Sequence, residues 1–384
     1  MLTPATSEAE FLFRIVQYAG NPEEAKKRIT EIVRTDPDWS EIARLASHHG
    51  LSSQLHQVLD TVEKGAPEWL QQELQERYQN NALNNLQYAQ HLHELLETFD
   101  EHNIRAIPYK GPVLAEYAYG SLDRRWFGDL DFIVAKEDIL RARKLLLRRG
   151  YRQTNAQGIS PSSLVEGSVF RWEQEFRFIK DDLRVELRYQ LAGGEQASSQ
   201  TFSDLWKNRV SLTIAGRPLH GLSPENRALL LLRHGTKHGW CRLSWVYDMG
   251  LVMQQEIRWK DVLSRAEQCG WTAAVLLGLA VTVEFADVTA PWSVRREIST
   301  NIRADWGASV LKTLFRRDPS GEAVDVDPLT LILFLNDTWE GSVRELVDVV
   351  FSPSIATYEL LPLRPSLYPL YYFLRPVELI LKLT

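Results

Sequence analysis

The stretch GSLDRRWFGDLDFIV, residues 120–134, places a Gly-Ser turn ahead of an apolar β run that begins with two carboxylates. Residues i and i+2 of a strand point to the same side, so we expect Asp129 and Asp131 to project from one face of a sheet. Two adjacent carboxylates repel each other unless a cation lies between them. Hard oxygen ligands of this kind select Mg²⁺ or Mn²⁺. The stretch therefore predicts a metal-binding strand, with a strand-end pair that caps a turn as the alternative.

A third carboxylate lies on a strand that we expect in the same sheet. The runs FRWEQEFRFI (170–179) and LRVELRYQL (183–191) flank a short polar turn, a pattern typical of a β-hairpin. Glu186 is the one acid of the second run. Three carboxylates that hold two metal ions can activate an attacking oxygen and stabilise a leaving pyrophosphate. We therefore predict that Asp129, Asp131 and Glu186 are the catalytic and metal-binding residues.

Groups suited to an anionic substrate surround the two aspartates in the sequence. A Lys-Gly pair ends a short β run at 104–111 and opens a helix, whose first N–H groups and dipole favour anions. The Gly-Ser turn adds a hydroxyl, and the two arginines that follow it suit phosphate oxygens. Trp126 beside them either packs in the core, the favoured interpretation, or stacks on a base. The candidate phosphate-binding residues here are Lys110, Gly111, Gly120, Ser121, Arg124 and Arg125.

Apolar spacing and Gly or Pro punctuation predict a small α/β segment inside a helical chain. Helices are expected at 45–59 (a helix–turn–helix), 67–99, 111–120 and 136–150. We interpret the Gln- and Asn-rich face of the 67–99 helix as solvated surface. Together with the β runs, this predicts β-α-β-α-β-β over residues 104–191, and residues 211–220 predict a further short hairpin.

The chain returns to helical patterns after residue 223, with helices predicted at 224–238, 243–255, 259–270 and 272–286. His234 and His238 share one face of the first of them, with Lys237 between. Because no Glu follows His234, the metalloprotease motif is excluded. A structural zinc site is disfavoured, because the spacing to Cys241 and Asp248 matches no standard site. Two interpretations stay open: the histidines pack in the core, or the helix closes over a nucleotide with all three side chains near phosphate. In the second case Asp248 would orient one imidazole.

Composition narrows the class of protein. The chain has 384 residues, 44% of them apolar, and a formal charge of −6, so it suits a globular protein and argues against a nucleic-acid partner. Two cysteines and no signal-peptide pattern predict a cytoplasmic location. The tail LLPLRPSLYPLYYFLRPVELILKLT is rich in aromatic residues and Pro, and its charges argue against a membrane span. We expect it to pack on the body or on a protein partner, with contact to a membrane surface as the minority interpretation.

The motifs resemble those of the uncharacterised bacterial nucleotidyltransferase family within the DNA polymerase β-like nucleotidyltransferase superfamily. The resemblance is carried by Lys110-Gly111, Tyr119, Arg125 and Gly128-Asp129-Leu-Asp131-Phe-Ile-Val, then by Val185-Glu186-Leu-Arg-Tyr and the histidine pair. Seven residues separate Ser121 from Asp129, fewer than the superfamily pattern has. Arg188 stands where the family often has His, and either contacts phosphate or faces solvent.

The resemblance implies an α+β fold, mostly helical, with a minimal nucleotidyltransferase core made of a small mixed β-sheet and flanking helices. The expected domains are a helical region at 1–100, the core at 101–220 and a helical domain at 221–384 with the aromatic and Pro-rich tail. The implied activity is Mg²⁺- or Mn²⁺-dependent transfer of a nucleoside monophosphate from an NTP such as ATP to a hydroxyl or phosphate acceptor. Glu186 would complete the metal site and serve as general base. The candidate nucleotide-binding residues then also include His234, Lys237 and His238.

Other functions remain open at this point. The same carboxylates would serve a transferase that uses an activated sugar donor or modifies a peptide or protein hydroxyl. A degenerate nucleotide-binding scaffold is a further alternative, although a scaffold has no reason to keep a repulsive acid cluster. An RNA-end transferase is disfavoured because no basic stripe is evident in the sequence. The acceptor, a small molecule or a peptide, cannot be read from the residues.

Overall fold

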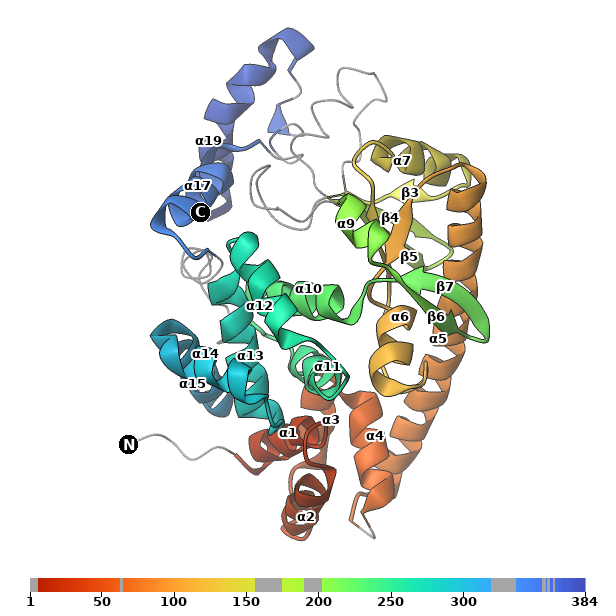
Figure 1. The fold of residues 1–384 in the computed structure, drawn as a ribbon. Coiled ribbons are helices and arrows are strands. Elements are labelled where there is room, and N and C mark those ends of the chain that lie inside the picture. The colour runs from red at the N-terminus through yellow and green to blue at the C-terminus, as the bar shows by residue number, and fades with distance from the viewer. Residues whose placement is uncertain are drawn as a thin grey trace. The chain divides into compact units, whose positions relative to one another are not determined.

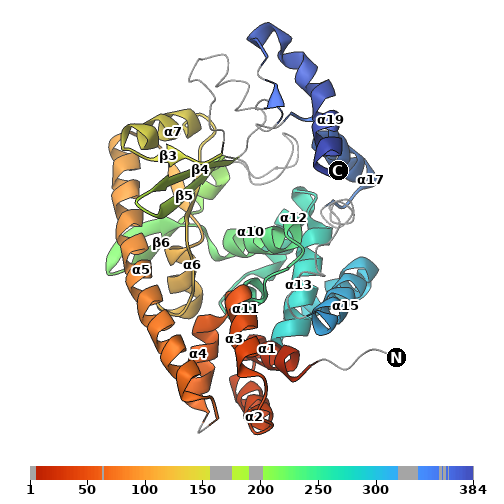
Figure 2. The same cartoon turned by 180° about the vertical axis from the view of Figure 1, so that it is seen from behind.

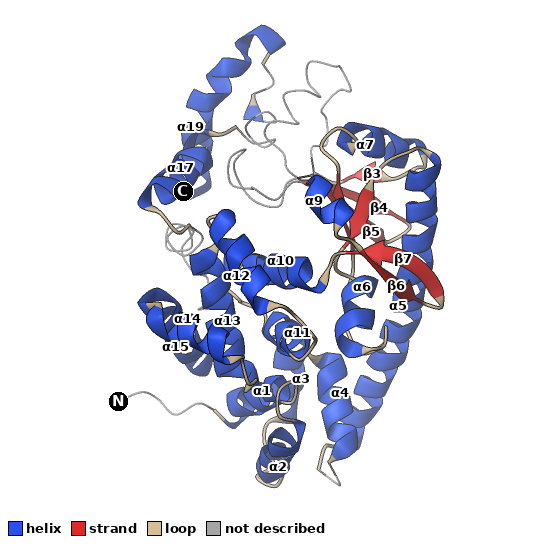
Figure 3. Cartoon of the chain, in the orientation of Figure 1, coloured by secondary structure: helices blue, strands red, loops and turns tan. Residues whose placement is uncertain are grey.

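The computed structural model describes residues 6–62, 65–155, 175–189, 202–318, 336–353, 357, 360–361 and 363–383. The chain is 64% helical with a small mixed sheet and a second two-stranded sheet, so the expected α+β class is confirmed. Figure 3 shows the strands gathered in one part of a mainly helical molecule. The described residues divide into two compact units, each built from segments that are far apart in the sequence.

The first unit, called here the helical unit, comprises residues 1–87, 114–127 and 223–337. Its first helices are α1 (Ser7–Gln17), α2 (Pro22–Val33), α3 (Trp39–His48), α4 (Ser52–Thr61) and the first half of α5 (Glu68–Glu101). Its later helices are α10 (Pro224–Lys237), α11 (Leu243–Met253), α12 (Trp259–Gln268), α13 (Thr272–Ala286), α14 (Trp292–Thr300) and α15 (Ile302–Arg317). These bounds agree closely with the helices expected at 45–59, 67–99 and after residue 223.

Helix α13 forms the centre of the helical unit. It is apolar all around, and nearly all of its side chains are buried. It packs against α10, α11 and α15, as Figures 1 and 2 show from opposite sides, and also against α1. A helix that is apolar on every side must be covered on every side, which explains why neighbours from both ends of the chain gather around it.

The second unit, the sheet unit, comprises residues 88–113, 128–222 and 338–384. Its strands are β1 (Ala106–Pro108), β2 (Leu130–Val134), β3 (Arg152–Gln153), β4 (Glu175–Lys180), β5 (Leu183–Arg188), β6 (Val210–Ile214) and β7 (Arg217–Gly221). The five-stranded sheet has the order β1-β2-β5-β4-β3, in which β2 and β5 run parallel and the other neighbours antiparallel. The second half of α5, α7 (Ile139–Arg148) and α9 (Phe202–Lys207) complete this part of the unit.

The two faces of the sheet differ in chemistry because side chains alternate along each strand. One face is apolar and buried: the ring of Phe132 on β2 contacts the ring of Phe99 on α5, with their centroids 5.5 Å apart. Val185 and Leu187 on β5 share the parity of Phe132 through the strand register and are also buried. The opposite face therefore receives Asp131, Glu186 and two charged residues of β4, Glu175 and Arg177.

Turn chemistry explains the two hairpins. Asp181 and Asp182 connect β4 to β5 with φ of 47° and 66°, a left-handed conformation that Asp tolerates. Ala215 and Gly216 connect β6 to β7 in the same way, with φ of 48° and 75°. Both hairpins agree with the sequence prediction, although the stretches 170–174 and 190–191 lie outside the described residues. The two-residue strand β3, which the β-α-β-α-β-β pattern did not contain, adds an edge to the sheet.

Two local expectations need correction. The 111–120 segment is a short α6 (Pro112–Leu114) that continues as a π-helical turn, η1 (Ala115–Tyr119), and ends at Gly120 in the left-handed conformation. The Asn-rich face of α5 is not simply solvated surface. Asn85 is fully buried, and its amide donates to the carbonyls of Leu122 and Arg125 at 2.6 and 2.8 Å.

The described part of residues 338–384 contains α17 (Trp339–Phe351), the 3-10 helix η3 (Pro365–Leu370) and α19 (Tyr371–Leu383). Both α-helices expose large apolar side chains, among them Trp339 at 76% and Phe373 at 75%. Within the described residues, no helix has the length and apolar character needed to cross a membrane. A protein partner for this tail, or contact with a membrane surface, stays a prediction.

Candidate active site

The strand register brings the three predicted carboxylates together. Asp131 on β2 is the register partner of Glu186 on the parallel strand β5, so both side chains leave the sheet on the same face. Asp129 lies one residue before β2, two positions from Asp131, and has the same parity. One carboxylate oxygen of each residue lies within 4.8 Å of the other two. Asp131 is 5% exposed, whereas Asp129 reaches the solvent.

This donor set fits a hard divalent cation. A Mg²⁺ ion lies about 2.0–2.1 Å from each ligand oxygen, so opposite ligands are about 4.2 Å apart. The observed span of 4.8 Å therefore needs only small side-chain rotations to close around an ion. Three carboxylates with no thiolate or imidazole among them select Mg²⁺ or Mn²⁺ over softer metals. The geometry is thus suited to the metal that the sequence predicts.

The electrostatics of Glu186 reflect its crowded position. Burial raises its pKa, the charge of Asp131 raises it further, and the result is a pKa of about 7 despite the neighbouring Arg188. Carboxylates crowded together without a counter-charge penalise each other's ionised form, and here the pKa of Glu186 is the one that rises. A bound cation would reverse this penalty, because it favours the ionised carboxylate.

Arg188, two residues after Glu186 on β5, bridges two of the acids on this face. Its Nη2 donates to Glu186 and, at 2.7 Å, to Glu175 Oε2 on β4. The register pairs Glu175 with Arg188 directly. Burial would raise the pKa of Glu175, but Arg188 and Arg177 lower it below its usual value. The Arg188 side chain is only 18% exposed, so it does not face solvent. It forms ion pairs with the acids of this face.

Two residues next to β1 complete the polar face. The Lys110 Nζ lies 3.7 Å from Asp131 Oδ1, and the Tyr109 hydroxyl donates to the same oxygen at 3.5 Å. Tyr109 is buried, which raises its pKa well above the usual value, and the charge of Asp131 raises it further. Its hydroxyl therefore stays protonated and available as a donor. Gly111 follows with φ of 53° and lets the chain turn into α6.

The remaining residues predicted to bind phosphate belong to the helical unit. Arg125 is held by Asp248 through a bidentate ion pair, with Nε and Nη2 at 2.8 and 2.9 Å from the carboxylate. Tyr119 donates to the same carboxylate at 2.6 Å. Burial and then Asp248 raise the pKa of Tyr119 well above its usual value. In this structure Arg125 and Asp248 thus form a buried structural pair.

The Gly120-Ser121 turn and the loop that follows it are also held by side-chain hydrogen bonds. Ser121 donates to the Asp123 carboxylate, which in turn accepts from Tyr78. Arg124 is exposed, and its carbonyl accepts from Gln54 at 2.7 Å. These contacts fix the course of the loop, while the predicted nucleotide contacts of Gly120, Ser121 and Arg124 stay predictions.

The histidine pair lies at the end of α10. The rings of His234 and His238 are 4.6 Å apart, and both contact Trp245. Lys237 between them is exposed. Whether these three side chains meet a nucleotide stays a prediction.

The sequence reasoning missed Glu175 and Tyr109. Glu175 had a detectable signal, because it shares strand parity with Arg177 and would pair opposite Arg188 in a tight hairpin. Tyr109 gave no such signal, since a tyrosine at the end of a short β run occurs in a hydrophobic core as often as in a functional site.

A comparison of the sequence with known protein families bears on this carboxylate site. The small mixed sheet carries three clustered carboxylates on and beside two adjacent parallel strands. The sequence model of an uncharacterised nucleotidyltransferase family matches residues 35–287, about two thirds of the chain. The protein therefore belongs to this uncharacterised nucleotidyltransferase family, as the motifs suggested. No curated protein and no solved structure matches the chain.

Proposed function

We propose that the protein transfers a nucleoside monophosphate from an NTP to a hydroxyl or phosphate acceptor, with Asp129, Asp131 and Glu186 as ligands of Mg²⁺ or Mn²⁺. The observation that carries this proposal is the register pairing of Asp131 with Glu186, which gathers three carboxylate oxygens within 4.8 Å. When bound, the divalent cation supplies charge neutralisation at the triphosphate and lowers the pKa of the attacking oxygen.

The residues of the chain have separate tasks in this reaction. Glu186 accepts the proton of the acceptor hydroxyl, whose oxygen forms a bond to the α-phosphorus. The bond from the α-phosphorus to the bridging oxygen breaks, and pyrophosphate leaves with the electron pair. Lys110, 3.7 Å from Asp131, brings a positive charge to the same face as the acids, where phosphate oxygens arrive. Arg188 keeps Glu186 and Glu175 in place.

Thermal stability with each NTP, in the presence and absence of Mg²⁺, tests this proposal before an acceptor is known. A ligand at about 100 times its Kd stabilises the folded state by about 2.7 kcal/mol. We expect at least one NTP to raise the melting temperature only when Mg²⁺ is present. The Asp129→Asn variant should lose this shift, because the ligand set loses a charge.

The matched control is Asp181→Asn, which changes the same functional group in the β4–β5 turn, at a left-handed position that Asn accepts well. The control should retain the full Mg²⁺-dependent shift. A shift of wild-type size in Asp129→Asn, or no shift with any NTP, would contradict the proposal and favour another activated donor or a scaffold role.

A further inference from the structure

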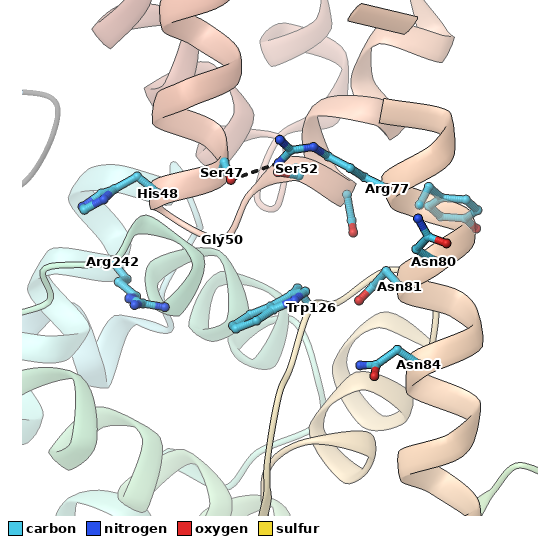
Figure 4. A pocket seen from close by; sticks show the side chains of 12 residues that line it. Ser47, His48, Gly50, Ser52, Arg77, Asn80, Asn81, Asn84, Trp126 and Arg242 are labelled. Atoms are coloured by element: carbon cyan, nitrogen blue, oxygen red, sulfur yellow. Dashed lines mark hydrogen bonds between the residues drawn. The ribbon is translucent and has the colours of Figure 1, made fainter. Parts of the chain in front are cut away.

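A pocket of about 730 Å³ lies within the helical unit. Its walls come from the end of α3, the start of α4, one face of α5, the loop before β2 and the residue that precedes α11. Figure 4 shows the side chains that line it. A volume of this size accommodates a small molecule of several rings or one ring with substituents. None of the predicted catalytic carboxylates lines it.

The pocket is electropositive. Among the described residues that line it, none is acidic, while Arg77, Arg242 and His48 are all present. Arg77 is partly neutralised by Glu73 at 2.7 Å. Arg242 is exposed and forms no side-chain hydrogen bond or ion pair with the described part of the chain. In Figure 4 its guanidinium extends toward the indole of Trp126. An available guanidinium in a site without carboxylates favours a phosphate or carboxylate group.

The remaining lining is made of amides and hydroxyls instead of aliphatic side chains. Asn80, Asn81 and Asn84 project from α5 at positions that share one face of the helix. Asn81 is 8% exposed; its amide nitrogen donates to the Asp123 carbonyl at 3.0 Å, and its side-chain oxygen has no hydrogen-bond partner in the described residues. A buried acceptor left without a donor destabilises the folded protein. A ligand hydroxyl would remove this cost, and Asn amides can both donate to and accept from such hydroxyls.

Trp126 provides a flat apolar surface at the same pocket. Its side chain is 55% exposed, which contradicts the favoured expectation that it packs in the core. It forms no aromatic pair or hydrogen bond with the described residues. An exposed indole beside amides and guanidinium groups suits a ring with one apolar face and a polar rim. A sugar ring, whose C–H groups lie on its faces and whose hydroxyls lie around its edge, has this shape.

We propose that this pocket binds a phosphorylated sugar ring, with the ring on Trp126, its hydroxyls on the α5 asparagines and its phosphate on Arg242. The ring can come from a monosaccharide phosphate or from the ribose phosphate of a nucleotide. This binding site is additional to the carboxylate site and does not depend on the metal.

Fluorine NMR of the full-length protein labelled with 5-fluorotryptophan tests the proposal. The chain has 12 tryptophans, and the Trp126→Phe variant assigns the signal of Trp126 by its disappearance. Glucose 1-phosphate, ribose 5-phosphate and AMP are titrated without Mg²⁺, together with glucose and inorganic phosphate. We expect the Trp126 signal to shift saturably with at least one phosphorylated sugar, and binding to be at least about tenfold weaker for glucose and for inorganic phosphate.

Variants separate this pocket from the carboxylate site. Arg242→Gln should weaken binding at least about tenfold, whereas Arg295→Gln, an exposed arginine on α14 outside the pocket, should leave it unchanged. Asp131→Asn should also bind as the wild type does, so failure of the proposed nucleotidyl transfer would not affect this result. If only AMP binds, the ring belongs to a nucleotide. If only a hexose or pentose phosphate binds, the ligand is a free sugar phosphate.

Three results would overturn the proposal. The first is that the Trp126 signal does not move with any phosphorylated sugar. The second is that it moves equally with inorganic phosphate or with glucose. The third is that the Arg242→Gln variant binds the phosphorylated sugar as tightly as the wild type does. In the last case the binding occurs elsewhere. Because Arg242 and Trp126 are exposed, neither substitution should impair folding, and circular dichroism of each variant checks this directly.

Discussion

Asp131 and Glu186 are register partners on the parallel strands β2 and β5, although 54 residues stand between them in the sequence. Parallel pairing places side chains of partner residues next to each other on one face of a sheet. The distance between the two carboxylates is thus set by backbone hydrogen bonds and by the buried apolar face beneath them. Loops contribute little to this spacing, so a single substitution can remove a ligand without moving the others.

Asp131→Asn tests the catalytic importance of this pair. The amide keeps the shape of the side chain but removes the charge that a divalent cation needs. We expect the rate of NTP-dependent pyrophosphate release to fall at least about 100-fold, which corresponds to about 2.7 kcal/mol of transition-state stabilisation. Asp182→Asn in the β4–β5 turn is the matched control and should keep wild-type activity. Equal rates for both variants would remove Asp131 from the mechanism.

The pKa of Glu186 makes a prediction about pH in the metal-free protein. Because burial raises this pKa from 4.5 to about 7, the folded state holds a proton that the unfolded state releases. The contribution of Glu186 to stability therefore falls as pH rises from about 4.5 to about 7 and is constant above that. The full change is at most about 3 kcal/mol.

Urea unfolding in EDTA measures this effect as the difference between wild type and Glu186→Gln. The glutamine side chain cannot titrate, so the stability of this variant carries no contribution from ionisation at position 186. The stability difference should thus decline between pH 4.5 and 7. A difference that is flat over this range, or that grows with pH, would show that Glu186 is ionised throughout.

The buried pair of Arg125 and Asp248 predicts a loss of stability. Asp248→Asn leaves the Arg125 guanidinium, whose side chain is 13% exposed, without a compensating charge. Breaking one side of a buried ion pair costs about 3–5 kcal/mol. Chemical denaturation should show a lower midpoint with an unchanged slope.

A second change can compensate for the first. The double variant Arg125→Met with Asp248→Leu removes both charges, so it should recover part of the lost stability. If the double variant is less stable than Asp248→Asn, the pair contributes through geometry that apolar side chains cannot replace, and the electrostatic explanation fails.

The hydrogen bonds of Asn85 predict that its substitution destabilises the loop before β2. Its amide donates to two carbonyls of the loop, at Leu122 and Arg125. Asn85→Ala leaves both without this donor, at a cost of about 1–3 kcal/mol for each buried group. Hydrogen exchange should become faster in residues 121–127 while the rest of α5 keeps its protection. Substitution of Asn84, which holds no such carbonyl, is the control.

Much of the fold followed from local sequence signals. The helices after residue 223 and the two hairpins matched because Gly, Pro and apolar spacing act over a few residues. The three acids were predictable because strand parity fixes the face of a side chain. The partner of Arg125 was not, since Asp248 lies 123 residues away and no local pattern connects them. The buried role of Asn85 was equally hidden, because an Asn on a helix gives the same signal whether it faces solvent or a loop.

The discontinuous composition of the two units has a consequence for biosynthesis. The chain passes from one unit to the other after residues 87, 113, 127, 222 and 337. The apolar face of α1 therefore stays uncovered until its partners α11 and α13 leave the ribosome, which happens only after residues 88–222 have been made. At about 5–20 residues per second, this delay lasts roughly 7–27 s. Nascent chains that stop before residue 223 should consequently be strong clients of chaperones, and fragments cut at that point should aggregate instead of folding as separate domains.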